Sequence, residues 1–440
     1  MFEVRERPEM VERAMLVGIY FDPREEEEAA ALLEELHELV DTLGINIVHS
    51  VFYRSREMHK QYICGTGKAQ ELVDLAHAYE CDVIIFDNGL APSQQRSWEK
   101  LGDIAVIDRE EVILDIFNKR AHTREARIQV DLARMQYALP RMARMWGHLD
   151  REGGGAGGGS GGGGGANRGM GEKQIEVDRR LAYTRIDRLK RELEDVRSQR
   201  KTQRKEREKL GTAHAAIVGY TNSGKSTLLN KLSGSEVLAK DMLFATLDTT
   251  TRRIELPDGQ PLLLTDTVGF VRNLPHRLVE AFKATLEEAV LADFLIHVLD
   301  CSSPEIDRLY DTTLEVLEEL GAGEKKIITI LNKSDLLEDP VQRLLLENRY
   351  PGAIYTSAAQ GENLDALLQL CCEALADRIR KQSYRIPQAR GDVLNLLHRD
   401  AKVLSTSYEE NDIIVEAVVP ESIAGKLSGF SISPTAPSAL

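Results

Sequence analysis

Short apolar runs alternate with amphipathic stretches along the first hundred residues. Apolar runs of strand length occupy residues 14–21, 45–53, 82–88 and 103–108. Polar and apolar positions recur at helical spacing in residues 25–44, 68–80 and 91–102. Strands of four to eight residues that alternate with helices favour a small parallel sheet. Residues 1–110 are therefore expected to form an α/β domain.

The apolar spacing changes after residue 110. Steps of four and three residues alternate in two series, which are Ile128, Leu132, Met135, Leu139, Met142 and Trp146, then Ala182, Ile186, Leu189, Leu193 and Val196. This period is typical of two helices that pack along one seam. Residues 111–210 are expected to form an antiparallel helical hairpin, with Pro140 kinking its first arm. The Gly-rich segment at 153–171 is then the tip loop of the hairpin and does not link two globular bodies.

Strand and helix signals alternate again in the second half of the chain. Apolar strand-like runs occur at 215–220, 261–269, 293–300, 326–333 and 352–358. They predict a second α/β domain over residues 211–383. Residues 384–440 are expected to form a small C-terminal domain, with a helix, two strands joined through 409–412 and a disordered tail from 431. The fold class is therefore multidomain α/β.

The net charge of −15 argues against non-specific binding to nucleic acid over the whole chain. Residues 119–209 nevertheless carry 23 Lys and Arg against 13 Asp and Glu, a local excess of about +10. A basic block on an acidic chain is either a surface that binds phosphates or a solvated helical face. Composition alone does not separate the two.

Other compositional features point to a cytosolic protein. The five cysteines form no CxxC pair and no metal-ligand spacing, which favours free thiols in a reducing compartment; they are Cys64, Cys81, Cys301, Cys371 and Cys372. No stretch approaches the length of an apolar membrane span, and the N-terminus lacks the apolar core of a signal peptide. We expect a cytoplasmic location, with peripheral association at a membrane as the alternative. A monomer is favoured.

The sequence GYTNSGKST fits the phosphate-binding loop G-x-x-x-x-G-K-[ST] from Gly219 to Ser226. It follows an apolar strand and precedes a helix, as this motif requires. Backbone amides of residues 220–226 are expected to cradle phosphate oxygens at the helix N-terminus. Lys225 would reach the β- and γ-phosphates, and Ser226 would offer its hydroxyl to Mg²⁺.

Three further segments follow predicted strands in the order expected of a GTPase. In DTVG, Asp266 would hold Mg²⁺ through water, and the Gly269 amide would sense the γ-phosphate. In NKSD, a buried Asp335 would accept two hydrogen bonds from guanine, which adenine does not offer. TSA at 356–358 suits a loop that contacts the guanine oxygen. The predicted nucleotide-binding residues are Gly219, Tyr220, Thr221, Asn222, Ser223, Gly224, Lys225, Ser226, Thr227, Asp266, Thr267, Val268, Gly269, Asn332, Lys333, Ser334, Asp335, Ser357, Ala358 and Ala359.

Two positions bear on the hydrolysis of GTP. A threonine between the phosphate loop and Asp266 must reach Mg²⁺ and the γ-phosphate, and the candidates are Thr246, Thr249, Thr250 and Thr251. Phe270 stands directly after Gly269, where many regulatory GTPases have a glutamine that orients water. A phenyl ring does not position water, so hydrolysis is expected to be slow without a partner.

These segments together resemble the HflX family of bacterial GTPases over nearly the whole chain. GMGEKQIEVDRR at 169–180 resembles the family stretch GPGETQLETDRR, and GYTNSGKST, FATLDTTTRRI and LTDTVGFVRNLPH are near matches. VIDREEVILDIF and ARIQVDLARMQY in the N-terminal half are also similar to family stretches. The sequence departs from the family in its much longer Gly run and in Met170 and Lys173, where Pro and Thr are usual.

The resemblance implies several functional assignments. It makes Thr246 the Mg²⁺-binding threonine and places Phe244, Ala245, Thr246, Leu247 and Asp248 along the nucleotide. Lys225, Thr246 and Gly269 would then be the catalytic residues, with Ser226, Thr246 and Asp266 at the metal. It also implies binding to rRNA of the large ribosomal subunit, GTP hydrolysis stimulated by the ribosome, and splitting of stalled or idle ribosomes under stress, with the hairpin tip reaching towards the peptidyl-transferase region.

Two other functions remain open at the level of sequence. The chain would be a GTP-regulated switch if the hairpin docked a protein outside the ribosome. It would be an ATP-dependent RNA remodeller if the N-terminal domain held its own ATP site, although the sequence has no second phosphate loop and no helicase-like motif array. A steep loss of affinity with salt would favour RNA over a protein partner.

Overall fold

The computed structural model describes residues 11–142, 166–209, 212–234, 244, 247, 249–272, 287–337, 339–375, 379–409 and 411–432. The chain divides into two compact units. The first comprises Met1–Val196, Asp241–Asp248 and Val271–Lys283, and the second comprises Arg197–Lys240, Thr249–Phe270 and Ala284–Leu440. The finer division into four domains remains a prediction.

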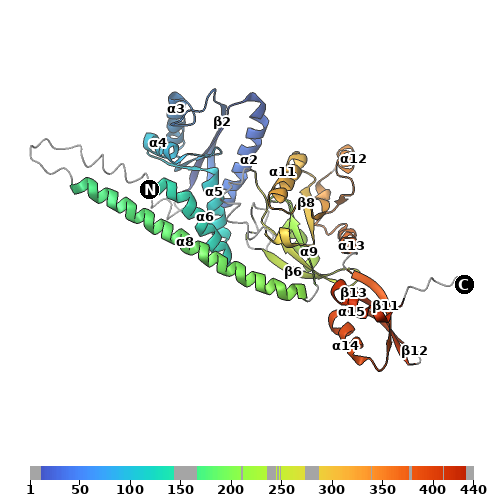
Figure 1. Cartoon of the computed structure of the whole chain (residues 1–440). Helices are drawn as coiled ribbons and strands as arrows, with labels where there is room; N and C mark the ends of the chain where they lie inside the picture. The colour runs from blue at the N-terminus through green and yellow to red at the C-terminus, as the bar shows by residue number, and fades with distance from the viewer. Residues whose placement is uncertain are drawn as a thin grey trace, which may run out of the picture. The chain divides into compact units, whose positions relative to one another are not determined.

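The first unit contains the predicted parallel sheet (Figure 1). Its strands are β1 (Arg13–Tyr20), β2 (Asn46–Arg54), β3 (Val83–Phe86) and β4 (Ala105–Asp108). All pairings are parallel and the order is β2-β1-β3-β4. The connecting helices are α2 (Glu26–Leu43), α3 (Thr66–Ala78), α4 (Pro92–Gly102) and α5 (Arg109–Arg120). The strands and helices predicted from apolar spacing are confirmed.

Helices cover both faces of this sheet because successive side chains of a strand point to opposite sides. Met15, Val17 and Ile19 of β1 pack with buried side chains of α3 and α4, among them Trp98. On the other face α2 packs against β1 and β2, and α5 packs against α2. Helix α2 ends at Leu43 and is capped by Gly44, whose φ of 77° is a left-handed conformation that glycine adopts without a steric penalty.

The predicted helical seam is also confirmed. Helices α6 (Arg124–Met142) and α8 (Ala166–Lys209) share one apolar cluster. Its members are Ile128, Leu132, Met135, Leu139, Ile186, Leu189, Leu193 and Val196. Pro140 lies inside α6 near its end. The side chain of Met142, Trp146 and the glycines of 153–165 lie outside the described residues.

The start of α8 corrects one predicted boundary. The tip loop was expected to reach residue 171, whereas α8 begins at Ala166, directly after the last residue of the glycine run.

The second unit contains a six-stranded sheet in the order β10-β9-β8-β5-β7-β6. The predicted strands correspond to β5 (Ala213–Val218), β7 (Pro261–Asp266), β8 (Phe294–Asp300), β9 (Lys326–Asn332) and β10 (Ile354–Tyr355). Strand β6 (Thr250–Glu255) was not predicted, and it pairs antiparallel with β7 at the sheet edge. Three of its six residues are charged and it begins with two threonines, so apolar spacing does not reveal it.

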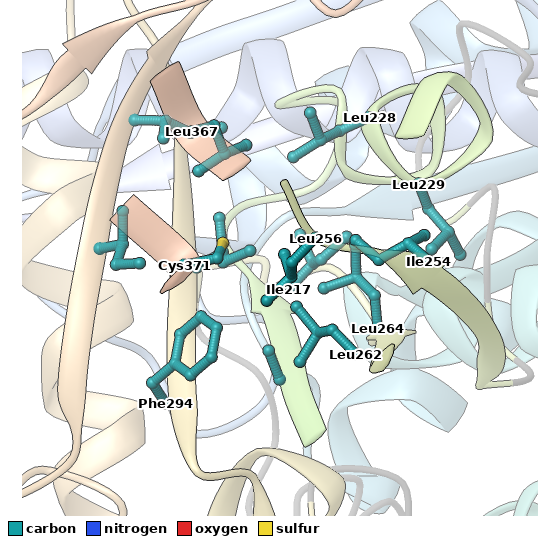
Figure 2. Close-up of a cluster of buried hydrophobic side chains, with 14 of the residues drawn as sticks. Ile217, Leu228, Leu229, Ile254, Leu256, Leu262, Leu264, Phe294, Leu367 and Cys371 are labelled. Atoms are coloured by element: carbon teal, nitrogen blue, oxygen red, sulfur yellow. The ribbon is translucent and has the colours of Figure 1, made fainter. Parts of the chain in front are cut away.

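Helices α9 (Lys225–Ser233), α11 (Ile306–Glu319), α12 (Pro340–Arg349) and α13 (Leu364–Ala374) accompany this sheet. Figure 2 shows the core between the strands and two of these helices. Ile217, Leu262, Leu264 and Phe294 from the strands meet Leu228 and Leu229 of α9. Leu367 and Cys371 of α13 complete the cluster. This core holds the carboxyl ends of β5, β7 and β9 in one sheet, where the candidate site lies.

Residues 379–432 form a third sheet, which is antiparallel throughout and has the strand order β12-β13-β11-β14. The expected helix and two strands are α14 (Gly391–Asp400), β12 (Lys402–Glu409) and β13 (Asp412–Pro420). Strand β11 (Ile379–Pro387) was missed because charged and polar residues conceal its alternation, and it crosses the boundary predicted at 384. The segment also contains α15 (Glu421–Leu427) and β14 (Ser431–Ile432). Residues 431–432, expected in a disordered tail, pair with β11.

Two expectations about the chain as a whole concern cysteines and membranes. All five cysteines are free thiols; four are buried and Cys372 is partly exposed. Burial raises the pKa of Cys371 to about 12, which makes its thiol unreactive. Among the helices in the described part of the chain, none combines the length and the apolar composition needed to cross a membrane.

Candidate functional site

The phosphate loop connects β5 to α9 and has the backbone that its motif requires. Gly219 has φ of 146° and Gly224 has φ of 97°, both in the region that favours glycine. A Cβ atom on Gly219 would lie 2.4 Å from the carbonyl oxygen of Val298, and one on Gly224 would lie 2.2 Å from Nδ2 of Asn332. Both positions therefore exclude any larger residue, and the loop wraps closely in front of α9.

Lys225 is the first residue of α9 and is only 6% exposed. Its ammonium donates a hydrogen bond to the carbonyl oxygen of Tyr220 within the same loop. Burial lowers the pKa of Lys225 to about 8, and the nearby carboxylate of Asp266 opposes that change. A buried cation against the loop backbone is the arrangement that stabilises phosphate oxygens.

Ser226 and Asp266 bring two oxygen ligands together. Asp266 ends β7 and is 1% exposed, and its Oδ2 accepts a 2.7 Å hydrogen bond from Oγ of Ser226. Hydroxyl and carboxylate oxygens suit Mg²⁺, so this pair fits the predicted metal. Mg²⁺ held by Ser226 and Asp266 would supply the positive charge that stabilises phosphate oxygens. No group of three or more His, Cys, Asp or Glu residues that could hold a metal occurs among the described residues.

The segment after β7 is hydrogen-bonded to the phosphate loop. The Phe270 amide donates to the Gly219 oxygen at 3.1 Å, and the Thr221 amide donates to the Phe270 oxygen at 2.8 Å. A Cβ on Gly269 would lie 2.7 Å from Cγ2 of Thr221 and 3.0 Å from Nζ of Lys225. Gly269 thus lies directly beside the loop and its lysine. The Phe270 side chain is 1% exposed, and its apolar ring has no group that orients water.

Asn332, at the end of β9, connects three parts of the site. Its Nδ2 donates to the Ser223 oxygen at 2.8 Å, and its Oδ1 accepts from the Ala358 amide at 2.9 Å. The hydroxyl of Thr356 lies 3.4 Å from the same Oδ1. The side chain is 2% exposed. Asn332 therefore fixes the phosphate loop and the loop after β10 to one strand end.

The residues predicted to recognise the base, Lys333 to Asp335, differ in their burial and in their contacts. Lys333 has φ of 62°, a left-handed conformation that turns the chain after β9. Its ammonium pairs with Asp300 at 2.7 Å. The next residue, Ser334, donates its amide hydrogen to the Thr356 oxygen. Asp335 was expected to be buried, but it is exposed on the short helix Ser334–Leu336. This helix follows the end of β9 and contains no buried residue. Its carboxylate is accessible to a base edge.

The loop after β10 is held mainly by its own contacts. Ser357 is fully buried, and its Oγ accepts a hydrogen bond from the Gln360 amide at 3.1 Å. The Ala358 amide is engaged by Asn332, whereas Ala359 is exposed. The bonds from the Ser334 amide to the Thr356 oxygen and from the Ala358 amide to Asn332 place the loop beside the NKSD segment, and its contact with the guanine oxygen remains a prediction.

Several other predicted nucleotide-binding residues make contacts within the protein, and their role at the nucleotide remains a prediction. Thr267 is fully buried and its hydroxyl donates to the Ile217 oxygen at 2.7 Å. Val268 is 5% exposed among apolar neighbours. In the first unit, the ring of Phe244 packs on that of Phe117 with centroids 4.6 Å apart, and Leu247 is 3% exposed. Ala245, Thr246 and Asp248 lie outside the described residues.

His297, on β8, was not among the predicted site residues. It is fully buried, stacks on Tyr310 at 5.3 Å between ring centroids, and has no hydrogen-bond partner for either ring nitrogen within the described residues. Burial and the nearby Lys225 ammonium lower its pKa to about 3, so the ring is neutral. The signal available in the sequence was a histidine in the middle of the otherwise apolar run Phe294–Leu299.

Comparisons with known families agree with this geometry. Residues 30–118 match a family described as GTP-binding GTPase N-terminal, and residues 120–207 match one described as GTP-binding GTPase Middle Region. Residues 214–333 match a family described as 50S ribosome-binding GTPase. Among solved structures, a GTP-binding protein from Sulfolobus solfataricus in complex with GDP is 24% identical, with a TM-score of 0.43 over 83% of this chain and 99% of that one.

Relatives named GTPase HflX match over nearly the full length. The one from Akkermansia muciniphila is 61% identical over 98% of this chain and 99% of its own. The one from Lacrimispora saccharolytica is 42% identical over 97% and 98%, and the one from Escherichia coli is 39% identical over 86% and 87%. The resemblance drawn from the sequence motifs is confirmed, and with it the prediction of a GTP-hydrolysing enzyme. This chain belongs to the HflX family of GTPases.

Proposed function

We propose that this GTPase binds the large ribosomal subunit through rRNA and dissociates stalled or idle ribosomes under stress. The observation that carries the proposal is the cationic outer face of α8. The matched family description, 50S ribosome-binding GTPase, supports the choice of partner. A ribosomal partner also supports a cytoplasmic location.

The two sides of α8 differ in chemistry. Ala182, Ile186, Leu189 and Leu193 are buried, and the last three belong to the cluster shared with α6. Outside this buried stripe the helix exposes six cations within residues 179–191, which are Arg179, Arg180, Arg185, Arg188, Lys190 and Arg191. Among them, Arg188 forms an ion pair with Glu192 at 2.8 Å. Asp187 is the one acidic residue within 179–191, so cations exceed anions in this stretch, and such an excess fits a polyphosphate backbone.

Aromatic and apolar side chains lie among these cations. Tyr183 is 45% exposed, and the guanidinium of Arg179 lies 5.7 Å from its ring centroid. Leu181 is 61% exposed. Unpaired RNA bases stack on aromatic rings and guanidinium planes, and phosphates bind the cations beside them. This combination favours RNA over an acidic protein as the partner.

The nucleotide site supplies the switch for this interaction. We assign phosphate binding to the loop from Gly219 to Thr227 and to Lys225, Mg²⁺ to Ser226 and Asp266 together with Thr246, and base selection to Asp335 with the loop 357–359. Gly269 lies beside Lys225, so a γ-phosphate bound there would be next to the segment that changes with nucleotide state. Binding to the ribosome would then depend on GTP.

Co-sedimentation with purified large subunits tests the RNA interaction. The variant Arg179→Glu/Arg180→Glu/Arg185→Glu should lose most binding in the presence of a non-hydrolysable GTP analogue. The logarithm of its association constant should also fall less steeply with the logarithm of salt concentration, by about one unit of slope for each phosphate that the variant no longer binds.

The matched control reverses three exposed arginines elsewhere, Arg24→Glu/Arg343→Glu/Arg349→Glu, whose side chains are 89%, 51% and 59% exposed. It should bind with the parent's salt dependence. Equal losses in both triple variants, or unchanged binding of the α8 variant, would contradict an rRNA interaction through this face.

A further inference from the structure

We propose that the hydroxyl of Thr221 orients the attacking water at the γ-phosphate, the part that glutamine plays in many regulatory GTPases. All the residues involved belong to the second unit, and the reaction is the GTP hydrolysis established above. The role of Thr221 does not depend on the ribosomal partner.

The position of Thr221 follows from contacts on both sides. Its amide is hydrogen-bonded to the Phe270 oxygen, and its side chain fills the space where a Cβ of Gly269 would lie. The same point beside Gly269 is 3.0 Å from Nζ of Lys225. Gly269 and Lys225 are the two residues expected at the γ-phosphate, so Thr221 lies next to the reacting group.

The hydroxyl of Thr221 is the second observation. The residue is 6% exposed, yet Oγ1 has no hydrogen-bond partner in the described part of the chain. Buried hydroxyls nearly always have a partner, because leaving one unpaired costs free energy. By contrast, the buried hydroxyl of Thr267 donates to the Ile217 oxygen. A ligand that supplies a donor and an acceptor would satisfy Thr221, and a γ-phosphate with its attacking water supplies both.

Hydrolysis by this route conserves atoms and electrons. The water oxygen forms a bond to Pγ, while the bond between Pγ and the βγ-bridging oxygen breaks and its electron pair leaves with GDP. A proton of the water passes to the phosphate product. Thr221 accepts a hydrogen bond from the water and donates one to a γ-phosphate oxygen, so it is neither consumed nor ionised. This positioning needs no polar group at position 270.

Two single substitutions separate the hydroxyl from the methyl group. Thr221→Val keeps the methyl that packs against Gly269 and removes the hydroxyl, whereas Thr221→Ser keeps the hydroxyl and removes the methyl. In single-turnover hydrolysis of GTP by the full chain, Thr221→Val should be slower than the parent by on the order of 100-fold. Thr221→Ser should stay within a few-fold of the parent. The affinity for GDP, which lacks the γ-phosphate, should change little in either variant.

Thr312→Val and Thr312→Ser are the matched controls, because Thr312 lies on α11 and its hydroxyl donates a hydrogen bond to the Arg308 oxygen at 2.9 Å. Both control variants should hydrolyse GTP at the parental rate. The opposite order of activities, with serine slow and valine normal, would overturn the proposal in favour of packing alone. Parental rates in both Thr221 variants would also overturn it. So would slow hydrolysis accompanied by an equal loss of GDP affinity, which would indicate a damaged phosphate loop.

Discussion

Replacing Asn332 tests how far nucleotide affinity depends on one buried amide. In Asn332→Ala, the Ser223 oxygen loses a 2.8 Å hydrogen bond and the Ala358 amide loses one of 2.9 Å. Each backbone group left unpaired in a buried site costs about 1–3 kcal/mol. Part of this cost would fall on folding, because the same bonds join the phosphate loop to β9 in the free protein.

If about 3 kcal/mol falls on the nucleotide-bound form, the affinity for GDP drops by roughly 100-fold. Equilibrium titration with a fluorescent GDP derivative measures this change directly. Asn348→Ala on α12 is the matched control, since Asn348 is exposed and its amide donates to the Leu344 oxygen at 3.0 Å. If the affinity of Asn332→Ala fell by less than about three-fold, in a protein that remains folded by circular dichroism, Asn332 would not have this role.

Three further outcomes concern stability and backbone geometry. The pKa of His297 is about 3 in the folded protein and 6.5 in the unfolded chain, so below pH 6.5 the unfolded chain binds one proton more than the folded protein. In urea titrations, the parent should therefore lose about 2 kcal/mol more stability than His297→Phe between pH 7.5 and pH 5. Glu35→Ala should cost the first unit about 3 kcal/mol by the same method, because Arg109 is buried and pairs with Glu35 at 2.6 Å and Asp87 at 2.7 Å. Gly224→Ala should abolish GDP binding in the titration used for Asn332→Ala, since its Cβ would overlap Nδ2 of Asn332.

The sequence predicted the elements that carry strong periodicity or strong motifs. Apolar runs located every strand of the parallel sheet in the first unit, and the alternating steps of four and three located the seam between α6 and α8. The phosphate loop was placed correctly because glycine, lysine and serine occur there at a fixed spacing between a strand and a helix. In each case the residues that make up the sequence pattern are the same residues that make the contacts in the folded protein.

What the sequence did not predict depends on pairing, exposure or side-chain contacts that the residues themselves do not reveal. Strand β6 is stabilised by its pairing with β7, although its own residues are mostly polar. Asp335 was expected to be buried from its proposed role, but its exposure is set by the short helix that carries it. The contacts of Asn332 with the Ser223 oxygen and the Ala358 amide join residues 109 and 26 positions apart, so no local pattern reveals them.

The helical hairpin is the part of this GTPase that we propose acts on the ribosome. The decisive measurement is GTP hydrolysis by the purified full chain, with and without isolated large ribosomal subunits. A variant trimmed to four residues across 153–165 should be measured beside it. We expect strong stimulation of the intact chain by the subunits and weaker stimulation of the trimmed one, and no stimulation of either would contradict a ribosomal role.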